Sequence, residues 1–189
     1  MIHANDIEKG MYLRINGKVY EVLEEEMITP GNEVSFIDVK LKNIFNRGIL
    51  TRTLNPLEVL EEVYIDTIEA AYLGEDDGFR CFRSIQSGNE IRVKNSVAGS
   101  GMRFVRTGTI VIVRTCDGRA FGVDIPDFLE LAVTEIRKAK DEQYCTAVLE
   151  TGARTAAPSF IKEGDRIVVD TRTGAFLYRN DKESIDKKR

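Results

Sequence analysis

Side chains that could carry catalysis are few in this sequence. The only histidine is His3, beside the start of the sequence, so we do not expect a Ser-His or Cys-His pair. A serine or cysteine nucleophile needs a base such as histidine beside it. We therefore predict no catalytic residue and no enzymatic activity, and we interpret His3 as a solvated side chain.

The cysteines do not form a metal-binding pattern. Cys81, Cys116 and Cys145 are 35 and 29 residues apart, and no Cys-x-x-Cys pair occurs. Zinc sites and disulfide frameworks use closer pairs or more ligands. We predict reduced thiols that pack as small apolar side chains.

Two acidic runs and one glycine-rich segment also fall short of a ligand site. Glu24–Glu26 and Glu61–Glu62 lie in segments expected to be strands, where consecutive side chains point to opposite faces and do not converge on a metal. Gly99-Ser100-Gly101 lacks the Lys-Ser/Thr that follows in a phosphate-binding P-loop. The sequence predicts neither a metal nor a cofactor.

Charge argues against a strongly basic nucleic-acid binder. The chain has 189 residues and a net charge of −4, and residues 1–63 hold 7 basic and 11 acidic side chains. Residues 64–127 hold 8 and 9, and residues 128–189 hold 12 and 11. Because phosphate contacts are made mainly by Lys and Arg, any RNA contact must come from local basic faces and from shape.

The sequence shows no sign of a membrane partner or of secretion. Its longest uninterrupted apolar run, Ile110–Val113, is far too short to cross a bilayer. The first ten residues do not have the basic and apolar regions of a signal peptide. We expect a cytoplasmic protein.

Hydrophobic periodicity is close to two along most of the chain, which favours strands. Asn16-Gly17 lies between alternating segments and predicts a tight β-hairpin. Residues 35–41 place Ile37, Val39 and Leu41 on one face. Residues 49–54 are the next predicted strand, and Pro56 ends the ladder because it cannot donate a hydrogen bond.

The later strands follow the same pattern. We predict strands around 71–73 and 79–82 flanking the turn Glu75–Gly78, a loop or short helix at 95–101, and a hairpin that turns at Asp117-Gly118. Further strands are predicted at 128–136, 146–149 and 166–169, with a polar connection at 137–143, a last hairpin at 171–174 and a frayed tail at 181–189.

These short strands divide into three stretches of similar length. We predict an all-β protein with three consecutive small β-barrels, spanning residues 1–63, 64–127 and 128–189. Barrels of the SH3-like or OB kind suit such lengths, because closure removes exposed strand edges.

Several motifs resemble bacterial elongation factor P. The opening segment, Asn5–Met11 followed by Asn16–Val22, resembles the opening of that family. Thr29–Phe36 lies where the family has a hairpin tip reading roughly Lys-Pro-Gly-Lys-Gly-Gln-Ala-Phe. Ile125–Leu131 resembles its Pro-Pro-x-Phe-Val-Glu-Leu segment. The most specific match is to the third-domain signature, in Leu149–Ala153, Pro158–Asp165 and Val169–Gly174.

The resemblance implies an L-shaped, tRNA-like molecule with an SH3/KOW-like barrel followed by two OB-folds. It also implies a monomeric translation factor without cofactor that binds the ribosome and peptidyl-tRNA and promotes peptide bonds at proline runs. The family's first-domain tip reaches toward the end of the peptidyl-tRNA. That would place Thr29, Pro30, Gly31, Asn32 and Glu33 at the tRNA.

The tip departs from the family pattern. Asn32 stands where relatives have a modified Lys or an Arg, and Glu33 beside it would repel phosphate. Two interpretations stay open: the tip is a simple hairpin turn, or it has a specialised function. Residues 134–143 likewise lack the family's Gly-Asp-Thr motif.

With no cation at the tip, RNA affinity must come from basic side chains elsewhere. The candidates are Lys40, Lys42, Arg52, Arg137, Lys138 and Lys140. Alternatives to the standard factor are a divergent paralogue with a regulatory role and an OB-fold module that binds RNA or protein away from the ribosome.

Overall fold

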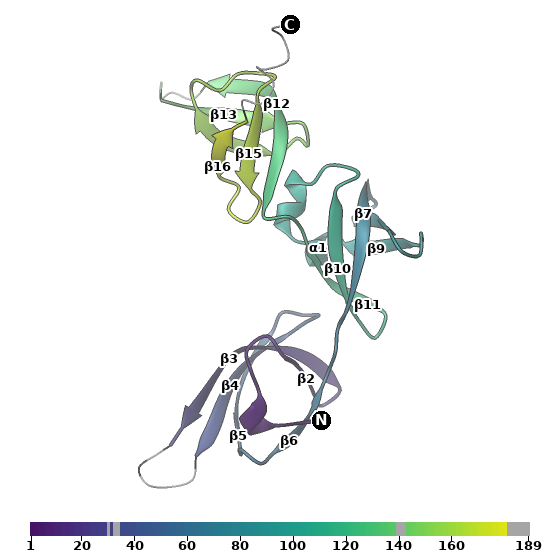
Figure 1. The fold of residues 1–189 in the computed structure, drawn as a ribbon, viewed down its shortest axis with the longest axis vertical. Helices are drawn as coiled ribbons and strands as arrows, with labels where there is room; N and C mark the ends of the chain where they lie inside the picture. The colour runs from purple at the N-terminus through teal and green to yellow at the C-terminus, as the bar shows by residue number, and fades with distance from the viewer. Residues whose placement is uncertain (30, 32–34, 139–142, 181–189) are drawn as a thin grey trace, which may run out of the picture. The chain divides into compact units, whose positions relative to one another are not determined.

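A computed structural model describes residues 1–29, 31, 35–138 and 143–180. Within these residues the chain forms three antiparallel sheets (Figure 1). They are organised in two compact units: residues 1–66 with 115–121, and residues 67–114 with 122–189.

The first sheet has the strand order β1-β6-β2-β3-β4-β5. Its strands are β1 (Ile2–His3), β2 (Tyr12–Ile15), β3 (Lys18–Ile28), β4 (Phe36–Asn43), β5 (Ile49–Leu54) and β6 (Val59–Glu62), with a 3-10 helix at Ala4–Asp6. The β2–β3 turn is the predicted Asn16-Gly17 pair. Asn16 has φ +50° and Gly17 φ +71°, the left-handed conformation that a two-residue hairpin needs.

The core of this unit comes from the inward face of its strands. Ile37, Val39 and Leu41 alternate with exposed or half-buried neighbours along β4 and are at most 4% exposed, as the sequence predicts. The turn at residues 115–121 belongs to the same unit. There Cys116 and Phe121 are buried with Val19.

The second sheet has the order β11-β10-β7-β8-β9. Its strands are β7 (Asp66–Asp76), β8 (Phe79–Ser84), β9 (Glu90–Lys94), β10 (Ile110–Cys116) and β11 (Arg119–Asp124). Between β9 and β10 lie the short helix α1 (Asn95–Ala98) and the 3-10 helix η2 (Ser100–Phe104).

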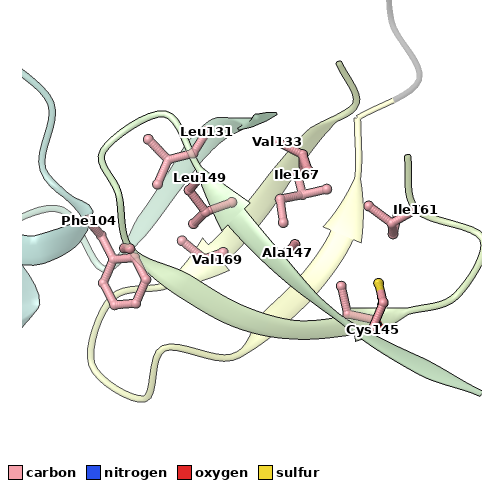
Figure 2. Close-up of a cluster of buried hydrophobic side chains, with 11 residues drawn as sticks. Phe104, Leu131, Val133, Cys145, Ala147, Leu149, Ile161, Ile167 and Val169 are labelled. Carbon is pink, nitrogen blue, oxygen red and sulfur yellow. Dashed lines mark hydrogen bonds between the residues drawn. The ribbon is translucent and has the colours of Figure 1, made fainter. Parts of the chain in front are cut away.

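The third sheet has the order β14-β13-β12-β15-β16. Its strands are β12 (Phe128–Lys138), β13 (Tyr144–Leu149), β14 (Arg154–Pro158), β15 (Arg166–Asp170) and β16 (Phe176–Arg179). Leu131, Leu149 and Ile167 form its core together with Phe104 from η2 (Figure 2). A side chain from η2 therefore completes the hydrophobic core of the third sheet.

The all-β fold with three β domains is confirmed, and the strand predictions hold with two corrections. Glu75 and Asp76 belong to β7, so the turn is only Asp77-Gly78. β12 continues to Lys138, so Arg137 is a strand residue and not part of a connection. The sequence interpretation missed β1, β6, β9 and β14.

The sequence also predicts domain boundaries, reduced cysteines and the absence of a membrane span. The boundaries at 63 and 127 stay predictions, since the compact units divide the chain differently. All three cysteines are free and buried, and burial raises the pKa of the Cys81 and Cys116 thiols. None of the helices in the described residues has the length and apolar character to span a bilayer.

Candidate functional site

The β3–β4 hairpin is the most extended feature of the first unit. Its strands pair as far as Ile28 and Phe36. Beyond that pair, the Thr29 and Ser35 hydroxyls lie 2.9 Å apart across the base of the loop. Figure 1 shows the hairpin projecting past the rest of its sheet.

The two halves of the hairpin have different surroundings. Near the barrel, Val22 of β3 and Leu41 of β4 are buried and anchor the hairpin in the core. A register shift between Val22 and Glu24 then interrupts the alternation, and Glu24–Ile28 are all exposed. On the β4 side, however, Ile37 and Val39 stay buried, and β4 pairs with β5 from Ile37 to Lys42. The hairpin therefore extends past its neighbouring strand only from the Ile28–Phe36 pair onward.

Of the predicted tip residues, Thr29 and Gly31 are described, and both are exposed. Gly31 has φ +63°. Pro30, Asn32 and Glu33 lie outside the described residues. In sequence, no Lys or Arg occurs between Lys18 and Lys40, whereas that segment contains the six acidic residues Glu21, Glu24, Glu25, Glu26, Glu33 and Asp38. Residues 19–39, which we call the acidic arm, therefore carry a strongly negative net charge.

The structure brings two of the three first-barrel cations onto one face. Lys40 and Lys42 are two residues apart on β4, so their side chains share a face. Arg52 pairs with Val39 across β4 and β5, which places it on the other face, where Val39 is buried. Lys40, Lys42 and Arg52 therefore do not form one patch.

Three of the candidate cations already have a carboxylate partner. Lys40 Nζ lies 2.9 Å from Glu24, and Arg52 Nη2 lies 2.6 Å from Glu58. Arg137 Nε donates to Glu135 at 2.7 Å. Ion pairs near the surface are screened by water and contribute little to stability, so a phosphate can compete for these cations.

Arg137 and Glu135 affect each other's ionisation. Their hydrogen bonds raise the pKa of the Arg137 guanidinium and lower the pKa of the Glu135 carboxyl. The other two candidates of this region are less defined. The backbone of Lys138 ends β12, and Lys140 lies outside the described residues.

Sequence reasoning missed an ion-pair cluster in the first unit. The Arg14 guanidinium binds Glu61 at 2.8 Å and Asp117 at 3.2 Å. These two carboxylates raise the pKa of Arg14. Nearby, the Arg119 guanidinium lies 4.3 Å from the centre of the Phe45 ring. The Asp117-Gly118 dipeptide signals a turn, but nothing in the sequence indicates which strand its carboxylate contacts.

The third-domain signature also has a structural explanation. Asp170 accepts hydrogen bonds from the side chain and the backbone of Arg172, which lower the pKa of the Asp170 carboxyl to about 2. Gly174 closes the same turn with φ +76°. The Val169–Gly174 motif therefore forms a hairpin turn, in which Asp170 accepts hydrogen bonds from the backbone of Arg172 and Gly174.

Comparison with known proteins matches both ends of the chain to one family. A family model described as "Elongation factor P (EF-P) KOW-like domain" matches residues 3–60. A second, described as "Elongation factor P, C-terminal", matches residues 129–179. Elongation factor P of Clostridium perfringens (strain SM101 / Type A) is 32% identical over 184 residues, covering 95% of this chain and 100% of that protein.

The chain belongs to the elongation factor P family. Elongation factor P of Agathobacter rectalis is 33% identical, again over 95% of this chain and 100% of that protein. Membership makes this chain a translation factor with a KOW-like domain followed by OB-type domains. The resemblance seen in the sequence motifs is thus confirmed over nearly the whole length.

Solved structures agree at the level of fold. "Eukaryotic translation initiation factor 5A from Methanococcus jannaschii" has a TM-score of 0.53 at 16% identity, covering 63% of this chain and 90% of that chain. A translation initiation factor eif-5a family protein from Naegleria fowleri has a TM-score of 0.50 at 13% identity, covering 65% and 93%. Both similarities concern architecture only.

Proposed function

We propose that this elongation factor P family member binds the ribosome beside the peptidyl-tRNA and promotes peptide-bond formation at stalling, proline-rich sequences. It acts in the cytoplasm as a monomer. It contributes no catalytic group or cofactor, but positions a substrate whose reaction another machine catalyses. Holding reactants in a productive geometry can by itself lower a barrier substantially.

The observation that carries this proposal is the β3–β4 hairpin. A ladder paired as far as Ile28 and Phe36 holds a short loop beyond the barrel. The hairpin lies within the KOW-like match at residues 3–60, and in this proposal its loop is the part that enters a confined site. Backbone pairing over this length fixes Ile28 and Phe36, the two strand ends from which the tip segment begins and ends, as a positioning role requires.

The acidic arm supports a second candidate, a divergent paralogue with a regulatory role. No Lys or Arg lies between Lys18 and Lys40, so the arm has no cation to contact tRNA phosphates. Such a protein would bind the same ribosomal site but alter, rather than accelerate, bond formation. A separate genomic copy with a Lys or Arg tip would favour this candidate.

Co-sedimentation with ribosomes tests the shared part of both candidates. The purified full chain is mixed with ribosomes that carry a peptidyl-tRNA and, separately, with vacant ribosomes. We expect the protein to pellet preferentially with the tRNA-bearing particles. Failure to pellet with either would exclude both candidates and favour an OB-type module that acts away from the ribosome.

A further inference from the structure

The second unit contains a polar cleft that the proposed function does not use. The cleft has a volume of about 760 Å³ and is bordered by the end of β7, η2 with the turn after it, and the β13–β14 turn. That volume falls within the range of roughly 300–1,000 Å³ typical of ligand sites.

Arginines dominate the charge of this cleft. Its lining includes Arg80, Arg103, Arg106 and Arg154 against only two carboxylates, Glu75 and Glu150. The chain as a whole has a net charge of −4. The cleft is therefore a local concentration of positive charge in an acidic protein, and a concave site of one sign attracts an oppositely charged ligand.

The two carboxylates are already engaged within the fold. Glu75 lies 2.9 Å from Arg80 Nη1. Glu150 Oε1 accepts the backbone N–H of Ala132 at 3.0 Å and lies 3.6 Å from Arg106 Nη1. Their charges are therefore largely balanced by Arg80 and Arg106, and neither competes for the remaining cations.

Arg103 and Arg154 are the cations left for a ligand. Both are exposed, and neither forms an ion pair with a carboxylate in the part of the chain that the structure describes. The Arg103 guanidinium lies 4.7 Å from the centre of the Phe104 ring, and Phe104 is itself fully buried. Arg154 begins β14 directly after the turn at Gly152. Secondary structure therefore holds both residues at the cleft before any ligand binds.

We propose that this cleft binds the phosphodiester backbone of RNA, with Arg103 and Arg154 as the phosphate-contacting residues. The planar guanidinium donates paired hydrogen bonds that match phosphate oxygens, which favours a phosphate ligand. The one aromatic ring in the lining, Tyr72, is 5% exposed and gives no platform for base stacking, so the cleft reads backbone rather than base identity. This inference rests on the proposed function only for the source of the RNA, ribosomal or transfer.

The direct test measures RNA binding without ribosomes. Fluorescence anisotropy with a labelled 12-nucleotide single-stranded RNA of mixed sequence compares the full-length wild type with Arg103→Gln/Arg154→Gln at several salt concentrations. We expect about 5- to 20-fold weaker binding at low salt. The slope of log affinity against log salt should be smaller by about 1.4, roughly 0.7 for each phosphate that the variant no longer neutralises.

A matched variant separates this site from overall charge. Arg83→Gln/Arg47→Gln removes two exposed arginines that lie outside the cleft, so it changes the net charge equally. We expect its binding to remain within about twofold of the wild type, because it removes only a diffuse attraction. Equal losses in the two double variants would overturn the proposal, and circular dichroism checks that both remain folded.

Two further measurements distinguish RNA from other anionic ligands, and the cleft from the proposed ribosomal function. If a 12-residue oligoglutamate binds as tightly as the RNA and loses affinity equally in Arg103→Gln/Arg154→Gln, the assignment to RNA is wrong. If RNA binding depends on the cleft but the wild type does not pellet with ribosomes, RNA binding by the cleft is supported and the proposed ribosomal function is contradicted.

Discussion

Gly174 lies against the ring of Phe104. A Cβ atom placed on Gly174 would be 3.2 Å from the ring Cζ atom and 2.8 Å from an Arg103 guanidinium nitrogen. Phe104 is fully buried in the core of the third sheet. The signature turn that ends at Gly174 therefore closes over the side chain that η2 contributes to this core.

This proximity predicts that Gly174→Ala is more destabilising than a comparable change elsewhere. Gly174 has φ +76°, so alanine incurs a backbone cost of about 1 kcal/mol in addition to the close approach to Phe104. The matched control is Gly164→Ala, with φ +89° and nothing within 4 Å of the added Cβ. We expect the unfolding free energy, measured in urea, to fall by about 1–2 kcal/mol more for Gly174→Ala. Equal losses would show that the ring and the turn adjust freely.

Asp170 predicts a specific dependence of stability on pH. Its carboxyl has a pKa of about 2 in the folded chain, below the value of about 3.9 expected when unfolded. The ionised carboxylate therefore stabilises the fold fully above about pH 5, and this contribution is lost as the pH falls through 4 toward 2. For Asp170→Asn we expect a lower urea midpoint at pH 7 and a smaller decrease of that midpoint between pH 4 and pH 2. Parallel pH curves for the two proteins would contradict this role of Asp170.

Because the acidic arm has no cation, we predict that a variant with a basic tip binds RNA more tightly than the wild type does. Asn32→Lys with Glu33→Gln raises the charge of the tip by two units. If the tip lies beside tRNA phosphates, ribosome affinity should rise by about 5- to 20-fold at low salt, with a steeper salt dependence. The chain offers a matched control in its other Asn-Glu dipeptide, changed as Asn89→Lys with Glu90→Gln. Identical effects of the two pairs would mean that the tip does not visit the site its relatives use.

Three basic residues, two at the end of β12 and one shortly after it in the sequence, are a further predicted point of attachment to RNA. Replacing Arg137, Lys138 and Lys140 together by Ala should weaken ribosome binding and reduce the salt slope by roughly 2–3, about 0.7–0.9 for each phosphate that these cations neutralise. Replacing Lys9, Lys18 and Lys94, which are exposed on separate elements, gives the same charge change as a control. Unchanged affinity and slope in the first variant would remove this region from the interface.

Much of the fold could be predicted because local signals and periodicity agree with it. Asn16-Gly17 specifies its own hairpin, and the alternation that ends in Leu41 specifies the buried face of β4. The short edge strands could not be predicted in this way. β1 has two residues and takes its place only by pairing with β6, more than fifty residues away.

The candidate site was less accessible to sequence reasoning. The motif around residues 29–36 locates the tip, because a turn between two strands is a local feature. The partners of the cations are not local: Arg52 reaches Glu58, and the cleft joins Arg103 to Arg154 from segments about fifty residues apart. Contacts between side chains that are distant in sequence depend on how the strands pair in the folded sheets. The spacing of residues along the sequence does not specify that pairing.

Peptide-bond formation at a proline run is the activity that decides the proposed function. A reconstituted translation system lacking any other elongation factor P decodes a message with consecutive proline codons, with and without this protein, alongside a message with alanine codons as control. We predict faster synthesis past the prolines when the protein is present and no change on the alanine message. Equal rates on the proline message, at protein concentrations that saturate the ribosome in sedimentation, would contradict it.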